Sequence, residues 1–140
     1  MASLINLKDF NDLSVVNKLL SECMCSDEER VNAEITKYLE DDSRGLYGRF
    51  LNDELVGLIG VKHGLIGEVE LKHISIKQNY RGKGIGRRMI HEYVQAKNIV
   101  KMKAETDKDA VGFYNKLGFT IMSLGKKYPG VERFECIFLL

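Results

Sequence analysis

The stretch Arg81-Gly-Lys-Gly-Ile-Gly-Arg-Arg88 decides how the rest of this chain is interpreted. It stands between a run typical of a β-strand and a run typical of an α-helix. Its backbone N–H groups therefore point outward at the positive end of the helix dipole, where an anion is stabilised. The glycines at 82, 84 and 86 let a phosphate approach the main chain without interference from Cβ atoms. With four cationic side chains around it, the turn predicts a site for a pyrophosphate.

Spacing argues against two other phosphate-binding turns. A P-loop requires Gly-x4-Gly-Lys-Ser/Thr, but with Gly82-Lys83 in register its first glycine falls on Lys77 and its Ser/Thr on Gly84. A Rossmann turn that starts at Gly82 places its third glycine at Arg87. It also belongs early in a chain, after a parallel first strand, whereas antiparallel strands come first here. A dinucleotide-dependent enzyme is therefore disfavoured, and preferential binding of NAD would be needed to support it.

Upstream of the turn, the pattern predicts a short strand, two helices and an antiparallel meander of three strands. Leu4 to Leu7 forms the first strand, and a helix follows from about Asp12 or Ser14 to Leu20. Ser26 and Glu29 form a capping box that opens a second helix, which lasts to about Asp41. The three β-like runs are 45–51, 55–63 and 68–76, with a hairpin turn at 52–54 and a break at 64–67.

Strict alternation along the third strand of the meander predicts its two faces. Val69, Leu71, His73 and Ser75 are expected on one face, and Glu70, Lys72, Ile74 and Ile76 on the other.

Downstream of the turn, Ile85 begins a helix that lasts to about Lys97, and a strand follows at 100–106. Asp107 caps a further helix, with Gly118 at its C′ position, and strands 119–124 and 134–140 form a final hairpin. The order is β-α-α-β-β-β-α-β-α-β-β, which predicts an α/β fold. The sheet is mixed and mostly antiparallel with helices on both faces, and only the strands flanking the central helix are parallel.

Composition predicts one cytoplasmic unit spanning residues 1–140. The 13 glycines are scattered, and there is a single proline, so no linker or repeat divides the chain. The start MASLINLKDFND lacks a cationic leader followed by an apolar run, and no stretch has the roughly 18 apolar residues of a membrane helix. Cys23, Cys25 and Cys136 form no CxxC pair, so we expect reduced thiols and no metal site.

The net charge of +1 conceals two segments of opposite sign. Lys77 to Lys103 holds eight basic residues and one acid, and Asp27 to Glu54 holds nine acids and four basic residues. The basic segment sits at a ligand turn and lacks interleaved exposed aromatics, so a nucleic-acid partner is not expected. The acidic segment weakly favours a cationic small molecule or a protein lysine as substrate, and a solvated helix surface explains it equally well.

Two motifs together resemble the signatures of the GNAT superfamily of acetyl-CoA-dependent N-acetyltransferases. The first is Arg-x-x-Gly-x-Gly at 81, 84 and 86, preceded by Ile-Ser-Ile-x-x-x-Tyr from Ile74 to Tyr80. The second is Ala110-Val-Gly-Phe-Tyr-Asn-Lys-Leu-Gly-Phe119. The resemblance covers about Glu68 to Phe119 and implies direct acetyl transfer from acetyl-CoA to a primary amine in a ternary complex.

The resemblance also implies roles for individual residues. Tyr114 matches the tyrosine that protonates the leaving CoA thiolate, and Glu70 matches a catalytic base of some members, with Glu68, His73 or a water relay as alternatives. Many members have Asn at the position of Asp107, where it contacts the pantetheine, and the aspartate is a departure from that pattern. The residues implied to bind the cofactor are Ile74, Ser75, Ile76, Arg81, Gly82, Lys83, Gly84, Ile85, Gly86, Arg87, Asp107 and Tyr114.

The resemblance leaves the acceptor amine open. In this superfamily the acceptor pocket is built by the loop between the first two helices and the loop between the last strands, here about 21–26 and 125–133. Neither loop has a pattern that names a substrate. The apolar final strand, Phe134–Leu140, is suited to pairing across a homodimer, which is a family habit. The alternative function is a non-catalytic CoA-binding sensor or interaction module. It is motivated by Asp107 in place of Asn and by the lack of a motif that assigns the base.

Overall fold

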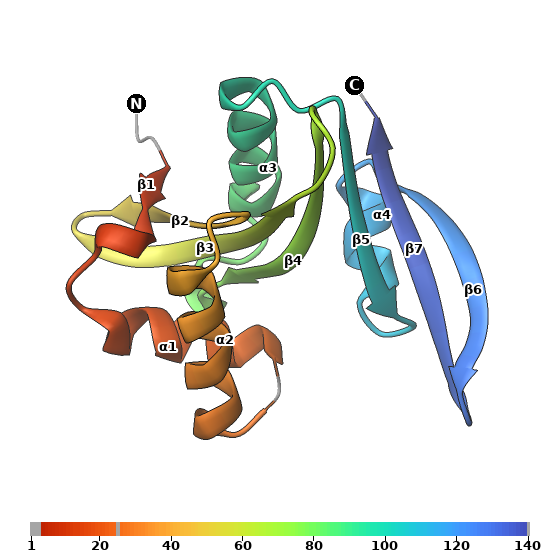
Figure 1. Cartoon of the computed structure of the whole chain (residues 1–140), viewed down its shortest axis with the longest axis horizontal. Helices are drawn as coiled ribbons and strands as arrows, with labels where there is room; N and C mark the ends of the chain where they lie inside the picture. The colour runs from red at the N-terminus through yellow and green to blue at the C-terminus, as the bar shows by residue number, and fades with distance from the viewer. Residues whose placement is uncertain (1–3, 25, 140) are drawn as a thin grey trace.

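A computed structural model describes residues 4–24 and 26–139 of the chain (Figure 1). The predicted order of elements is confirmed, with two short 3₁₀ turns in addition. The strands are β1 Ile5–Asn6, β2 Arg44–Leu51, β3 Glu54–His63, β4 Glu68–Ile76, β5 Lys101–Asp107, β6 Thr120–Tyr128 and β7 Val131–Leu139. The helical segments are η1 Leu7–Asp9, α1 Leu13–Met24, α2 Glu28–Glu40, η2 Gln78–Tyr80, α3 Ile85–Ala96 and α4 Val111–Lys116.

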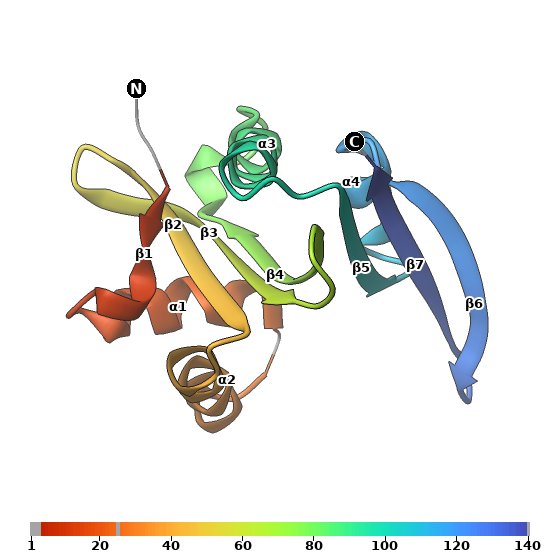
Figure 2. The ribbon, with the colours of Figure 1, turned by 45° about the horizontal axis from the view of Figure 1, so that its top comes forward.

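The strands form one twisted sheet in the order β1-β2-β3-β4-β5-β7-β6. Every pairing is antiparallel except that between β4 and β5, which flank α3, as predicted. α1 and α2 cover one face of the β1–β4 half, and α3 covers the other face (Figures 1 and 2). Two apolar cores result, one beneath α1 and α2 and a larger one that α3 and α4 share with the sheet.

Local sequence signals set several boundaries as expected. Asn52 and Asp53 both have positive φ angles, 51° and 64°, which is the conformation of a two-residue hairpin turn and one that these residue types tolerate. Gly118, with φ of 100°, follows the last turn of α4, where a left-handed residue ends a helix. No helix in the described ranges has the length and apolar composition needed to cross a membrane.

Several boundary predictions are corrected by the structure. The predicted loop at 125–133 is mostly strand, because β6 extends to Tyr128 and β7 begins at Val131. The N-cap of α2 is Asp27, whose side chain accepts a hydrogen bond from the Arg30 amide, and Ser26 lies one residue too early. α1 continues past Leu20 to Met24. Asp107 does not cap α4 directly, because its Oδ1 accepts from the amides at 109 and 110, ahead of the helix. Cys25 and Leu140 lie outside the described residues.

A β-bulge in β4 makes the prediction of its two faces wrong. Gly60 of β3 pairs with His73, but the next residue, Val61, pairs with Leu71, so Lys72 is an extra residue. Such a bulge reverses the alternation beyond it. Val69 and Leu71 therefore face the α3 core together with Ile74 and Ile76. Glu70 consequently shares the α1–α2 face with His73 and Ser75 rather than the face of Ile74.

β4 and β5 separate after the third residue of each strand, and this separation positions the site. They pair only at Glu68–Lys101, Val69–Met102 and Glu70–Lys103, and the rest of β4 has no β5 partner. Figures 1 and 2 show β5, β7 and β6 diverging from β4 as a second wing of the sheet. The buried Ser75 hydroxyl donates to the Leu19 carbonyl at 2.8 Å and ties the unpaired half of β4 to α1. The opening is therefore built into the fold.

Candidate functional site

A cavity of about 960 Å³ fills the space where β4 and β5 separate. The end of α1, the unpaired half of β4, the turn before α3, the end of β5 and α4 all contribute to its wall. The structure therefore brings together most of the predicted cofactor residues, namely Ile74, Ser75, Ile76, Arg81, Gly82, Gly84, Ile85, Gly86, Arg87, Asp107 and Tyr114. Lys83 and Glu70 are the predicted site residues that do not line it.

The turn at one end of the cavity has the geometry of an anion site. Gly82 and Gly84 have φ of 76° and 80°, a left-handed conformation that glycine adopts without strain. Gly84 is the N-cap of α3 and offers no side-chain acceptor to the first turn of the helix. Among the described residues, no group accepts a hydrogen bond from the backbone amides of 82–87. These amides are therefore available to a ligand at the positive end of α3.

The cations around the turn are held along its rim by backbone carbonyls. Arg81 Nε donates to the Ile76 carbonyl at 2.8 Å, and an Arg87 Nη donates to the Lys116 carbonyl at 2.6 Å. The Lys83 ammonium lies 5.6 Å from the centre of the Tyr80 ring. In the described part of the chain, no carboxylate forms an ion pair with Arg81, Lys83 or Arg87, so their positive charge remains beside the available amides. Both the available amides at the helix N-terminus and the cationic side chains therefore favour an anionic ligand here.

Tyr114 lies at the other side of the cavity and is only 8% exposed. Its ring packs edge-on against Phe113 and Phe119, with ring centres 5.5 Å apart in each pair. Burial raises the pKa of Tyr114 to about 12, so its hydroxyl keeps its proton at neutral pH. None of the described side chains or carbonyls hydrogen-bonds to this hydroxyl. The hydroxyl is therefore a proton donor available to a molecule in the cavity.

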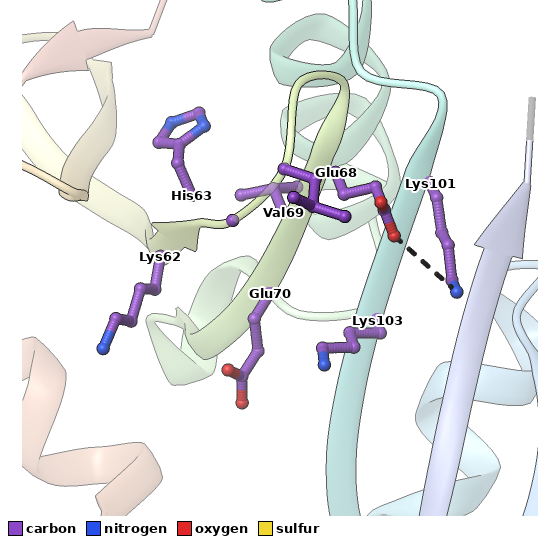
Figure 3. A pocket seen from close by; sticks show the side chains of 9 residues that line it. Lys62, His63, Glu68, Val69, Glu70, Lys101 and Lys103 are labelled. Atoms are coloured by element: carbon purple, nitrogen blue, oxygen red, sulfur yellow. Dashed lines mark ion pairs between the residues drawn. The ribbon is translucent and has the colours of Figure 1, made fainter.

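Glu70 and Glu68 line a second, smaller pocket of about 340 Å³ at the paired end of β4 and β5 (Figure 3). Glu68 is paired with Lys101 at 3.8 Å, and Glu70 lies opposite Lys103 in the sheet register. A Glu70 oxygen also lies 3.6 Å from the Lys72 ammonium. Glu70 thus occupies the last paired position before the strands part, on the α1–α2 face, next to the large cavity rather than in its wall.

Several lining residues carry no sequence signal of their own. Glu22, Cys23 and Met24 at the end of α1 and Arg133 of β7 line the cavity. They fall within the ranges 21–26 and 125–133 that the family resemblance implies for the acceptor, but the structure has them on a helix and a strand rather than in loops. His73 also lines it, with its Nδ1 2.6 Å from the buried Tyr38 hydroxyl. The sequence named His73 only as an alternative base; its contact with Tyr38 depends on the bulge in β4, which no residue pattern indicated. Among the described residues, none of the acidic segment 27–54 lines the cavity.

The sequence matches the model of the acetyltransferase (GNAT) family over residues 13–119. It is similar to the streptothricin acetyltransferase of Escherichia coli, with 28% identity over an alignment of 87 residues; the match covers 58% of this chain and 50% of that protein. The match therefore spans about half the length of this curated relative.

Two solved structures illustrate the likeness in fold. An aminoglycoside 6′-N-acetyltransferase complexed with coenzyme A has a TM-score of 0.76 and 18% identity, over 97% of this chain and 96% of that one. A GNAT family acetyltransferase from Elizabethkingia anophelis with acetyl-CoA bound has a TM-score of 0.74 and 19% identity, over 99% and 98% of the two chains. At such identities these structures show a shared fold. Because the family model matches most of the sequence, from α1 through the glycine turn to the end of the Tyr114 motif, this chain belongs to the acetyltransferase (GNAT) family.

Proposed function

We propose that the chain is an N-acetyltransferase that moves an acetyl group directly from acetyl-CoA to a primary amine. The observation that carries this proposal is the row of available amides at 82–87, which opens on the same cavity as the Tyr114 hydroxyl. A diphosphate-bearing donor and a proton donor for its leaving thiolate would meet there. The family membership and the CoA-bound structures of the same fold support acetyl-CoA as the donor.

The donor is proposed to lie along the length of the cavity. The turn amides and the Arg81 and Arg87 side chains would hold the diphosphate. The edge of β4 at 74–76, which has no β5 partner, would hold the pantetheine arm by backbone hydrogen bonds. A Cβ at Gly86 would lie 3.0 Å from the Ile76 Cδ1 atom, so glycine lets α3 and β4 pack closely in this part of the cavity wall. The donor's thioester would then lie near Tyr114, between the two wings of the sheet.

Transfer requires one proton to leave the amine and another to reach the departing sulfur. The amine nitrogen forms a bond to the acetyl carbon, and the bond between that carbon and sulfur breaks. Tyr114 supplies the proton to the thiolate, since its raised pKa keeps it protonated. In our proposal Glu70 takes the proton of the amine from the α1–α2 face, beside the point where β4 and β5 part.

Replacement of the proposed base gives a direct test of its role. Glu70→Gln keeps the size of the side chain and one acceptor oxygen but cannot accept a proton at neutral pH. We expect kcat to fall by about 10²-fold, with acetyl-CoA affinity unchanged. Glu68→Gln, which removes an ion pair in the same pocket, is the matched control and should leave kcat near that of the unaltered enzyme. An unaffected kcat in Glu70→Gln would exclude Glu70 as the base; a loss in Glu68→Gln would then assign the step to Glu68, and no loss in either variant would favour a water relay.

Asp107 offers a second prediction, because many family members have Asn at this position. Asn would keep the Oδ1 that accepts from the amides at 109 and 110, so Asp107→Asn should unfold at an unchanged temperature. It would also remove a negative charge from the cavity wall, so acetyl-CoA should bind equally or more tightly by calorimetry. Asp107→Ala loses the acceptor and should cost about 1 kcal/mol of stability. Weaker acetyl-CoA binding in Asp107→Asn would contradict this placement.

The acceptor is proposed to be a small molecule or peptide with a primary amine. Proteins that this chain resembles are named for acetylating streptothricin and aminoglycosides. The acceptor end of the cavity here has a balanced charge, with Glu22 and Glu105 against Lys72 and Arg133. Arg133 Nε lies 3.2 Å from a Glu105 oxygen. This balance favours an amine of low net charge over a polycation, contrary to what the acidic segment suggested.

The experiment that tests the function combines binding and turnover. Acetyl-CoA at millimolar concentration should raise the melting temperature, and incubation with a panel of amines should release free CoA thiol. A shift without turnover on any amine would favour the non-catalytic sensor. No shift would overturn the proposal, and a larger shift with NAD would point to a dinucleotide enzyme.

A further inference from the structure

His73 is held by a buried hydrogen bond that involves only one of its ring nitrogens. Its Nδ1 lies 2.6 Å from the hydroxyl of Tyr38, on α2. The Tyr38 side chain is fully buried, and among the described residues His73 is the only hydrogen-bond partner of its hydroxyl. The two rings meet edge-on, with centres 5.7 Å apart. The pair joins the helix layer to β4 just beyond the bulge.

The position of the proton follows from this burial. A buried tyrosine hydroxyl must donate its proton to an acceptor, because an unsatisfied buried donor is costly. Burial also raises the pKa of Tyr38 far above its usual range, so the hydroxyl stays protonated. The described acceptor within reach is the Nδ1 lone pair. The neutral imidazole of His73 must therefore carry its own proton on Nε2.

The Nε2 atom is the ring nitrogen that remains for the cavity. His73 lines the 960 Å³ cavity and its Nδ1 is turned to Tyr38, while no described group hydrogen-bonds to Nε2, which is not fully buried. Burial lowers the pKa of His73 to about 4, opposed by Glu34 and reinforced by Lys72 and Arg44. The ring is therefore uncharged at neutral pH. With Nδ1 occupied and Nε2 protonated, His73 has no lone pair to offer the cavity and cannot serve as the base.

The residues around Tyr38 hold its hydroxyl in the position that bonds to His73. Gly60, opposite His73 in the sheet, is required because a Cβ there would overlap the Tyr38 hydroxyl. The Arg44 guanidinium lies over the Tyr38 ring, 5.1 Å from its centre, and an Arg44 Nη is held by Glu34 at 3.1 Å. The Tyr38 side chain is therefore fixed by Gly60 on one side and by Arg44 on the other. Because its hydroxyl is held in place, it also fixes the orientation of the His73 ring that is bonded to it.

We propose that His73 is a specificity residue whose Nε2–H donates a hydrogen bond to an oxygen of the acceptor substrate, close to its amine. The acceptor class is then an amine with a neighbouring carbonyl, carboxylate or hydroxyl oxygen. This inference rests on the proposed acetyl transfer. Its geometric support is the face of β4 that carries His73. The α3 face, with Ile74 and Ile76, is next to the donor turn, whereas His73 faces α2 and the acceptor side.

The first test measures the proton directly and needs no substrate. The imidazole ¹⁵N chemical shifts of His73 at pH 7 should report a protonated Nε2 and an unprotonated Nδ1. In Tyr38→Phe this fixed tautomer should be lost, with a mixture of the two in its place. A protonated Nδ1 in the unaltered protein would overturn the proposal.

The second test uses variants and a pair of acceptors. The pair is the best amine from the panel and its analogue with the neighbouring oxygen replaced by CH₂. The unaltered enzyme should prefer the oxygen-bearing amine by about tenfold in kcat/KM. His73→Leu should abolish this preference through a higher KM, and His73→Gln, whose amide N–H replaces Nε2–H, should retain most of it.

The outcomes separate this inference from the proposed function. Acetyl-CoA binding in His73→Leu should equal that of the unaltered protein, since His73 lies on the acceptor side. If acetyl-CoA binds and amines are acetylated, but the best amine has no such oxygen, the role of His73 is refuted and acetyl transfer stands. The same conclusion follows if Leu and Gln at 73 behave alike. If acetyl-CoA does not bind at all, the proposed function itself fails.

Discussion

Tyr114→Phe should lower kcat by about 10²-fold and leave acetyl-CoA binding nearly unchanged. The ring is fixed by Phe113 and Phe119, so phenylalanine would keep the packing and lose only the hydroxyl. Without that hydroxyl, the CoA sulfur would have to leave as a thiolate without the proton that Tyr114 supplies. Steady-state kinetics with saturating acetyl-CoA, together with calorimetry of acetyl-CoA binding, measures both quantities.

The pH dependence and a control variant sharpen this result. Because burial raises the pKa of Tyr114 to about 12, its proton is retained throughout the range from pH 6 to about 10, and no loss of activity in that range should be due to this group. Tyr93→Phe removes another buried hydroxyl, which bonds to His63 at 2.6 Å outside the large cavity, and should leave kcat unchanged. Equal kcat in Tyr114→Phe and the unaltered enzyme would exclude Tyr114 as the acid.

Gly84→Ala should weaken acetyl-CoA binding at least about tenfold. Gly84 has a φ of 80°, so alanine adds backbone strain of about 1 kcal/mol. Its Cβ would meet no protein atom within 4 Å and would project into the open space beside the turn. That space is where the diphosphate is proposed to sit, so the methyl group and any shift of the turn act directly on the ligand. Calorimetry measures the affinity.

Gly130→Ala is a closely matched control for the turn variant. Gly130 has a φ of 77°, and its added Cβ would also meet nothing within 4 Å. It lies in the turn between β6 and β7, away from the glycine turn. Both variants should lose similar stability in chemical denaturation, but Gly130→Ala should bind acetyl-CoA normally. Equal binding by the two variants would show that the turn does not contact the donor.

The sequence was sufficient to predict the order of elements, because helix and strand periodicities are local. It also identified the glycine turn, whose residue types suit positive φ and an approaching phosphate. Tyr114 could be placed by its motif alone. The element order, the glycine turn and the Tyr114 motif each depend on residues that are close in sequence. The glycine turn also combines glycines with cationic side chains, a composition typical of phosphate-binding turns.

Other features depend on contacts between distant segments. The bulge at Lys72 is set by the pairing of β4 with β3, and simple alternation gave Glu70 the wrong face. The separation of β4 from β5 has no residue pattern of its own. The Tyr38–His73 bond joins residues 35 positions apart and needs glycine at 60, so neither side chain indicates it separately. Such features become visible only when the sheet is assembled.

The most direct test of the central claim is an NMR titration of the backbone amides with acetyl-CoA. If the glycine turn holds the diphosphate, the amide resonances of 82–87 should shift the most and saturate together with those of 74–76 on β4. CoA should reproduce the shifts at the turn, since it carries the same diphosphate. Saturable binding of acetyl-CoA that leaves the amides of 82–87 unchanged would contradict the account.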